Sequence, residues 1–182
     1  MIRKTKLAAV ALSAVMLGAA AAGSAQAACT QDDLTGTWQL HGFAYDGFAS
    51  NTVECYIKVK DTGRIAAGPR CFTTSVDNQG LVETDEATIA PGRSLKAKSN
   101  CKVVGAVKLD IDRPQNLQGQ DGQLTGTSIA VIDSAQLSQD KNIVTGIALE
   151  SFDGEFTIDQ VPEPQALTSK SVIYFTLNKI EP

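Results

Sequence analysis

Histidine is almost absent from this chain of 182 residues, which contains His41 and no other. A Ser-His-Asp triad needs a histidine with partners arranged around it, and a two-histidine metal site needs a second one. The sequence also lacks a C-x-x-C pair, a P-loop and a G-x-G-x-x-G turn, which are motifs of redox and nucleotide-binding proteins. We therefore expect no enzyme, no cofactor and no metal site.

Clusters of basic residues are also missing. Three of the 16 Lys and Arg precede residue 28, whereas none of the 20 Asp and Glu does, which leaves 13 basic against 20 acidic residues and a net charge of about −7. Such a surface repels nucleic acid and anionic lipid headgroups. Apolar stretches after residue 27 are far shorter than the ~20 residues of a membrane-spanning helix. We expect neither a nucleic-acid partner nor a membrane span.

Residues 1–27 have the pattern of a secretory signal peptide. Basic residues before position 7 precede an apolar run over 7–22, and residues 25–27 read Ala-Gln-Ala, an A-x-A cleavage site. We expect export to the periplasm or beyond the cell, with 28–182 as a single domain. A lipoprotein anchored through Cys29 is less favoured, because the position three residues before it lacks the usual aliphatic side chain.

The chain has four cysteines, Cys29, Cys55, Cys71 and Cys101. An even number of cysteines in an oxidising compartment predicts two disulfides. Alternation places Cys55 and Cys71 on the inward face of two expected strands, equidistant from Gly63, which favours a Cys55–Cys71 bond. Pairing of Cys71 with Cys101 stays open, because Gly68 and Pro69 disturb this hairpin.

Short runs that alternate β-branched and polar residues predict an all-β fold. We expect a single antiparallel meander barrel of about eight strands, with a β-sandwich as the alternative. Glycines inside several of these runs, such as Gly126 and Gly146, indicate the bends of a closing sheet. The expected strands cover residues 36–45, 53–60, 64–75, 81–90, 94–111 with a break near 100, 122–133, 142–152 and 170–180.

The segment 34–38 reads Leu-Thr-Gly-Thr-Trp and opens the first expected strand. It resembles the G-x-W signature with which lipocalin and avidin-type barrels begin, and small exported inhibitors of bacterial metalloproteases open with a comparable strand. Residues 173–177 are similar to the last strand of such barrels. The resemblance implies structural roles for Gly36, which allows a bend, and for Trp38, which packs across one barrel end. It implies no biotin site, because avidin-type sites are lined by several tryptophans and this chain has one.

The size of the inward side chains distinguishes a ligand-holding barrel from a filled one. Small inward residues leave room for a ligand, and bulky ones fill the interior. The small residues at expected inward positions are Gly42, Ala44, Ala67 and Gly105, and the bulky ones are Val53, Ile57, Val59, Val103, Val107 and Leu109. The bulky set predicts a filled interior.

We therefore predict a non-enzymatic domain that binds a partner protein through its loops. Phe43, Tyr45 and Phe48 cluster near the first expected turn and are the expected aromatic anchors. The segment 28–35 and the expected loops 113–120 and 160–170 are further contact regions. Two alternatives remain open: a lipocalin-like carrier of a small apolar ligand, and an exported protease-inhibitor barrel.

Two carboxylate pairs could in principle bind a cation or act as acid and base. Asp110 and Asp112 lie two apart in an expected strand, where alternation with apolar residues is typical of a solvated face. Asp32 and Asp33 suit the first turn of a short helix. His41 has the opposite parity to Trp38 and is expected to face solvent. We expect structural roles for both pairs.

Overall fold

The computed structural model describes residues 28–45, 50–76, 82–117, 120–158 and 163–181. The expected signal peptide lies outside the described residues. Among the described residues, no helix is long and apolar enough to cross a membrane. The elements are α1 (Gln31–Leu34), β1 (Gly36–Tyr45), β2 (Ser50–Val59), β3 (Arg70–Val76), β4 (Val82–Ile89), β5 (Leu95–Ala97), β6 (Val103–Leu117), β7 (Gln120–Leu137), β8 (Ile143–Ile158) and β9 (Gln165–Glu181).

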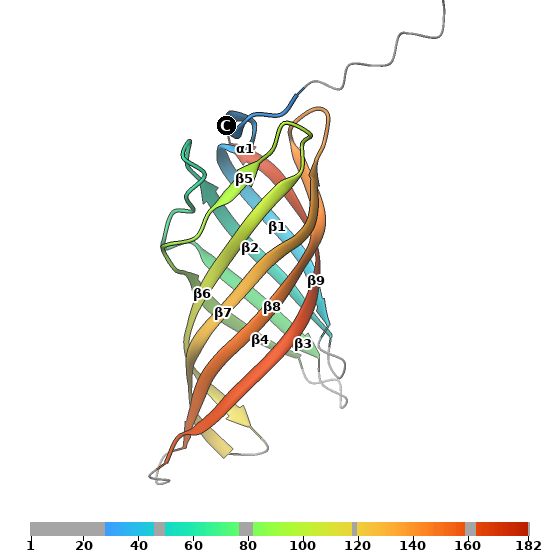
Figure 1. Cartoon of the computed structure of the whole chain (residues 1–182). Coiled ribbons are helices and arrows are strands. Elements are labelled where there is room, and N and C mark those ends of the chain that lie inside the picture. The colour runs from blue at the N-terminus through green and yellow to red at the C-terminus, as the bar shows by residue number, and fades with distance from the viewer. Residues whose placement is uncertain (1–27, 46–49, 77–81, 118–119, 159–162, 182) are drawn as a thin grey trace, which may run out of the picture.

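Eight of the strands form a closed antiparallel barrel in the order β4-β3-β2-β1-β9-β8-β7-β6 (Figure 1). The barrel closes where β4 pairs with β6, through the residue pairs Thr88–Asp110 and Ile89–Leu109. The short strand β5 pairs with the beginning of β6. The expected all-β meander barrel is confirmed, and the sandwich alternative is wrong.

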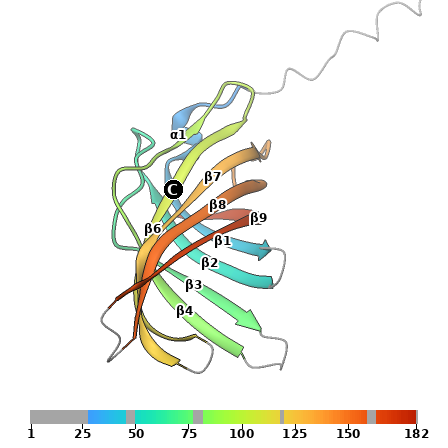
Figure 2. The same cartoon turned by 60° about the horizontal axis from the view of Figure 1, so that its bottom comes forward.

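Several strands are longer than expected. β6 continues to Leu117 and β9 begins at Gln165, so the expected loops 113–120 and 160–170 are largely strand. The β8–β9 ladder continues for seven residues of β9 beyond Val172, where the pairing of β9 with β1 ends. The long strands β6 to β9 therefore project past β1 to β4 at the end of the barrel opposite α1 (Figures 1 and 2).

The third strand is shorter than expected. It begins at Arg70, and not near residue 64. Gly68 has a φ of +103°, and Pro69 follows it without an N–H to donate, so the ladder between β2 and β3 cannot start earlier. The residues between β2 and β3 instead make isolated bridges, such as Val59 to Ile65.

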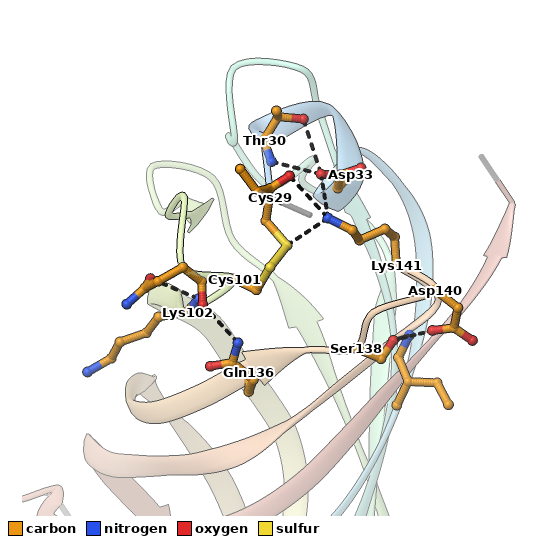
Figure 3. The surroundings of a disulfide bond; sticks show 12 residues. Cys29, Thr30, Asp33, Cys101, Lys102, Gln136, Ser138, Asp140 and Lys141 are labelled. Atoms are coloured by element: carbon orange, nitrogen blue, oxygen red, sulfur yellow. Dashed lines mark hydrogen bonds and ion pairs between the residues drawn. A yellow bond between two sulfur atoms is a disulfide. The ribbon is translucent and has the colours of Figure 1, made fainter. Parts of the chain in front are cut away.

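The four cysteines form two disulfides, Cys29–Cys101 and Cys55–Cys71. Cys55 and Cys71 lie directly opposite each other on β2 and β3, which is the register expected around Gly63. The alternative pairing of Cys71 with Cys101 is wrong, because Cys101 lies at the α1 end of the barrel beside Cys29 (Figure 3). Two disulfides fit an oxidising environment outside the cytoplasm.

One end of the barrel is closed by α1 and by the segment that precedes it. The backbone N–H of Thr30 donates to the Asp33 carboxylate at 2.7 Å, which caps the helix. The ammonium of Lys141 lies 3.2 Å from the same carboxylate and 2.8 Å from the Cys29 sulfur (Figure 3). The Cys29–Cys101 disulfide and this ion pair therefore attach the N-terminal segment to the barrel.

Trp38 lies at this closed end and is fully buried. Its indole N–H donates to the Leu34 carbonyl at 2.8 Å, and the Lys179 ammonium lies 5.4 Å from the centre of its ring. Gly36 has a φ of +130°, a conformation that favours glycine, where the chain turns from α1 into β1. The indole ring therefore joins the helix, the first strand and the last strand.

Candidate functional site

The barrel interior contains a cavity of about 510 Å³. The expected filled interior is therefore wrong. Val59, Val103 and Val144 are almost fully buried, but all three lie at the α1 end of their strands. Further along the barrel, inward positions are occupied by small residues such as Ala130 and Ala148, which leave the space open.

The part of the cavity nearest to α1 is apolar. Leu40 on β1 faces inward and is paired in register with Leu177 on β9 and Cys55 on β2. Ile57 and Phe175 add to the same wall. A ligand placed here would contact aliphatic and aromatic carbon, and burial of its own apolar surface would drive binding.

The part of the cavity farther from α1 is polar. Its side chains come from the halves of the strands that lie away from the helix, as with Asn51 at the start of β2, paired with Ser75 near the end of β3. The polar belt consists of Asn51, Thr73, Ser75, Asp85, Arg113, Gln115, Ser128, Glu150 and Ser169. The cavity is thus amphipathic along the barrel axis.

Arg113 and Asp85 form an ion pair within this polar belt. Arg113 comes from β6 and Asp85 from β4, the two strands that meet at the barrel seam. About a fifth of the Arg113 side chain and a quarter of the Asp85 side chain remain exposed. Opposite charges taken out of water in this way neutralise each other and limit the cost of desolvation.

Glu150 is the second charged group of the belt. The Ser171 hydroxyl donates to its Oε2 atom at 2.6 Å, and the hydroxyl of the buried Ser128 donates to its Oε1 atom. The three side chains come from the neighbouring strands β7, β8 and β9, whose register brings them together. Among the described residues, no Lys or Arg forms an ion pair with this carboxylate.

The two expected aromatic anchors that the structure describes lie on the outer face of the barrel. Phe43 and Tyr45 point outward from β1 and are 46% and 49% exposed, and Phe48 lies outside the described residues. Neither Phe43 nor Tyr45 lines the cavity. The segment 28–35 contains α1 and is held against the closed end.

Outward-facing apolar side chains continue from Tyr45 around the barrel wall, three of them exposed and Val172 half-buried. Tyr45 is paired in register with Val172, Val172 with Leu149, and Leu149 with Val131. We call these four residues the outer apolar row. Leu149 is 51% exposed and Val131 49% exposed, which is unusual for large apolar side chains in adjacent strands.

The carboxylate pairs found in the sequence do not form a site. Asp110 is exposed and pairs with Lys108 at 3.3 Å, and Asp112 accepts a hydrogen bond from Gln123 at 2.6 Å. Asp33 caps α1 and pairs with Lys141, while Asp32 lies in the same short helix. In the part of the chain that the structure describes, no three His, Cys, Asp or Glu side chains are grouped to hold a metal ion.

His41 faces outward from β1 and is exposed. The charged residues that line the cavity, Asp85, Arg113 and Glu150, were not among the candidates found in the sequence. The inward orientation of Glu150 could have been predicted, because Glu150 lies two residues from the inward Ala148 in the same strand and so shares its face. Arg113 could not be placed without knowing that β6 extends past residue 111.

No protein-family model matches the sequence, and no curated protein shows significant similarity to it.

Proposed function

We propose that this protein binds a small amphipathic molecule inside its barrel. The observation that supports the proposal is the cavity of about 510 Å³, apolar near α1 and polar farther from it. Cavities of about 300 to 1,000 Å³ are typical of small-molecule sites. This function corresponds to the lipocalin-like carrier, which was one of the alternatives left open by the sequence. The resemblance of the segment 34–38 to lipocalin-type barrels agrees with it.

The cavity suits a ligand with an apolar body and a polar head. Each methylene group that leaves water for the apolar end contributes about 0.8 kcal/mol to binding. A polar head would remain beside the hydroxyl, amide and charged groups of the belt, where its hydrogen bonds are replaced and not lost. The two ends of the cavity thus define one orientation for the ligand, with its tail toward Trp38.

The proposed site of action lies outside the cytoplasm. Two disulfides persist in an oxidising compartment, and the signal-peptide pattern of residues 1–27 agrees with export. The ligand would then be a molecule that the protein meets in the periplasm or the medium.

A fluorescence titration with the apolar probe N-phenyl-1-naphthylamine tests this function. The parent protein should bind the probe with enhanced emission. Ala148→Phe adds bulk inside the cavity and should weaken binding, whereas Leu149→Phe changes the next residue on the outer face and should leave binding unchanged. Equal binding by the parent and by a correctly folded Ala148→Phe variant would argue against the cavity as the site.

A second candidate function is protein binding through the outer apolar row. The exposure of Tyr45, Leu149 and Val131 on neighbouring strands favours it, because large exposed apolar patches often mark interaction sites. A pull-down that compares the parent with Leu149→Ser tests it. A partner that binds the parent but not the variant would support this function. A partner that binds both equally would exclude the outer apolar row as its binding site.

A further inference from the structure

We propose that the ligand of the cavity is a hydrophobic amine, whose ammonium group pairs with Glu150. This inference rests on the proposed function and names the chemical class of its ligand. It starts from the charged side chains that point into the cavity, which are those of Asp85, Arg113 and Glu150. Two of these three groups are acidic, so the wall has a net negative charge and is suited to a cation.

The other two charged side chains of the wall form an ion pair with each other, Arg113 with Asp85. Glu86 lies on the exposed face of β4, where it pairs with Arg70 at 2.9 Å. Among the described residues, Glu150 has hydrogen bonds from Ser128 and Ser171 and no ion pair. The wall therefore has one negative charge that no cation of the described chain offsets.

The hydrogen-bonding capacity of Glu150 leaves room for a ligand. An ionised carboxylate offers about four acceptor positions, and the two serine hydroxyls occupy one on each oxygen. Both hydroxyls use their single proton in these bonds, which orients the carboxylate within the cavity wall. A primary ammonium group has three donors and can bind the remaining acceptor positions.

A second acceptor in the polar belt is also available. The side-chain oxygen of Asn51 is buried and accepts no hydrogen bond among the described residues. Asn51 lines the same cavity from β2, while Glu150 lines it from β8. A buried acceptor without a donor costs free energy, so both residues favour a ligand head rich in N–H donors.

The same charges disfavour an anionic head such as a fatty-acid carboxylate. The Arg113 guanidinium is already neutralised by Asp85. A second carboxylate would lie in the same cavity as Glu150, where repulsion is stronger than in water because the surroundings are less polar. The ligand is therefore cationic at the belt and apolar toward the closed end.

The position of Glu150 orients such a ligand. On the side of α1, the next inward residue of β8 is Ala148, and the residue of β9 opposite Ala148 is Ile173. An ammonium at Glu150 would therefore be followed by an apolar wall that continues to Leu40 and Leu177. The ammonium head would contact the carboxylate of Glu150, and the alkyl or aromatic body would contact the apolar wall.

Isothermal titration with decylamine, decanol and decanoate, below their aggregation concentrations, tests the inference. The three probes share one chain length and differ in the head group. At about pH 7 the amine is cationic and the acid anionic. Decylamine should bind at least about tenfold more tightly than decanol, as a charge-assisted hydrogen bond predicts, and decanoate should bind most weakly.

Two variants locate the source of this preference. Glu150→Gln keeps the shape of the side chain and removes its charge, so decylamine should lose its advantage over decanol. Glu155→Gln, at an exposed position of the same strand, removes an equal charge outside the cavity and should leave the preference intact. If Glu150→Gln fails to fold, the comparison of the three probes on the parent protein still tests the inference.

The outcomes separate this inference from the proposed function. Equal binding of all three probes, or tightest binding of decanoate, would overturn the amine inference and leave a ligand-binding barrel. A preference for decylamine that survives in folded Glu150→Gln would also overturn it. If none of the three probes binds, both the amine inference and the proposed function are overturned.

Discussion

Asp85 on β4 and Arg113 on β6 face each other in the register of the barrel seam. Backbone pairing between β4 and β6 includes only Thr88 with Asp110 and Ile89 with Leu109. Asp85 precedes Thr88 by three residues, and Arg113 follows Asp110 by three, so the same antiparallel register places Asp85 opposite Arg113. The two side chains form an ion pair. Their side chains therefore continue the closure of the barrel beyond the end of its backbone ladder.

Removal of one partner of this ion pair should weaken the seam. Arg113→Met leaves the Asp85 carboxylate in the barrel without its guanidinium, and we expect a loss of about 3 kcal/mol in the free energy of unfolding. Arg113→Met combined with Asp85→Leu replaces both charges by apolar groups and should recover most of that loss. Urea denaturation followed by circular dichroism measures both. An Arg113→Met variant as stable as the parent would show that the pair does not hold the seam.

The two disulfides should differ in their contribution to stability. The Cys29–Cys101 bond joins residues 72 positions apart, whereas Cys55 and Cys71 are 16 apart. In the chain-entropy account, the longer loop gives a stabilisation of about 4 kcal/mol and the shorter one about 3 kcal/mol. Paired Cys→Ser variants of each bond, compared by thermal denaturation, test the order. A larger loss from the Cys55 and Cys71 variant would contradict this explanation.

Trp38 should contribute strongly to stability and little to ligand contact. Trp38→Ala deletes a fully buried indole and should cost about 3 to 5 kcal/mol. Trp38→Phe keeps most of the apolar ring but loses the hydrogen bond to the Leu34 carbonyl, which should cost about 1 kcal/mol. Tyr45→Ala, on the exposed face of the same strand, is the matched control. A Trp38→Ala variant as stable as this control would mean that the closed end is held by other contacts.

Asp33 should make the closed end sensitive to acid. The N–H of Thr30 and the ammonium of Lys141 lower the pKa of this carboxyl below its ordinary value of 3.8. The folded state therefore prefers the ionised form, so the stabilisation is complete above the ordinary pKa and is lost as the pH falls through the lower folded value. Asp33→Asn should lower the melting temperature at about pH 6 and have much less effect at about pH 2. An equal effect at both pH values would contradict this assignment, and Asp32→Asn controls for loss of a charge in the same helix.

The barrel and one disulfide could be predicted from the sequence because both depend on local patterns. Alternation with a period of two identified the strands and their inward faces, for example in β2, where Cys55 and Ile57 are buried. The symmetry of Cys55 and Cys71 about Gly63 was sufficient to place them opposite each other. Once Cys55 and Cys71 are paired, Cys29 and Cys101 are the two cysteines that remain, but the position of their bond depends on how the N-terminal segment folds over the barrel end, which no local pattern specifies.

The cavity also could not be predicted from the sequence, and the physical reason is a different one. The free volume of a barrel depends on its strand number and stagger, and these are properties of the whole sheet. Of the bulky residues expected to fill the interior, Val59 and Val103 lie at the α1 end, whereas Val53, Ile57, Val107 and Leu109 line the wall of the cavity and do not fill it. Arg113 was missed because the expected strand ended at residue 111 and residues 113–120 were expected to form a loop. Pro114 is accommodated in β6 because that strand pairs with β4 only at residues 109 and 110, so it interrupts no ladder on that side.

Methyl NMR during a titration with decanol tests most directly whether the barrel interior is the binding site. Decanol is neutral, so the result does not depend on the preference for amines. Ala130 and Ala148 point into the cavity, whereas their neighbours Val131 and Leu149 point outward in the same two strands. We expect the methyl signals of Ala130 and Ala148 to shift with one saturable affinity while those of Val131 and Leu149 stay in place. Shifts confined to Val131 and Leu149 would contradict it and assign binding to the outer apolar row.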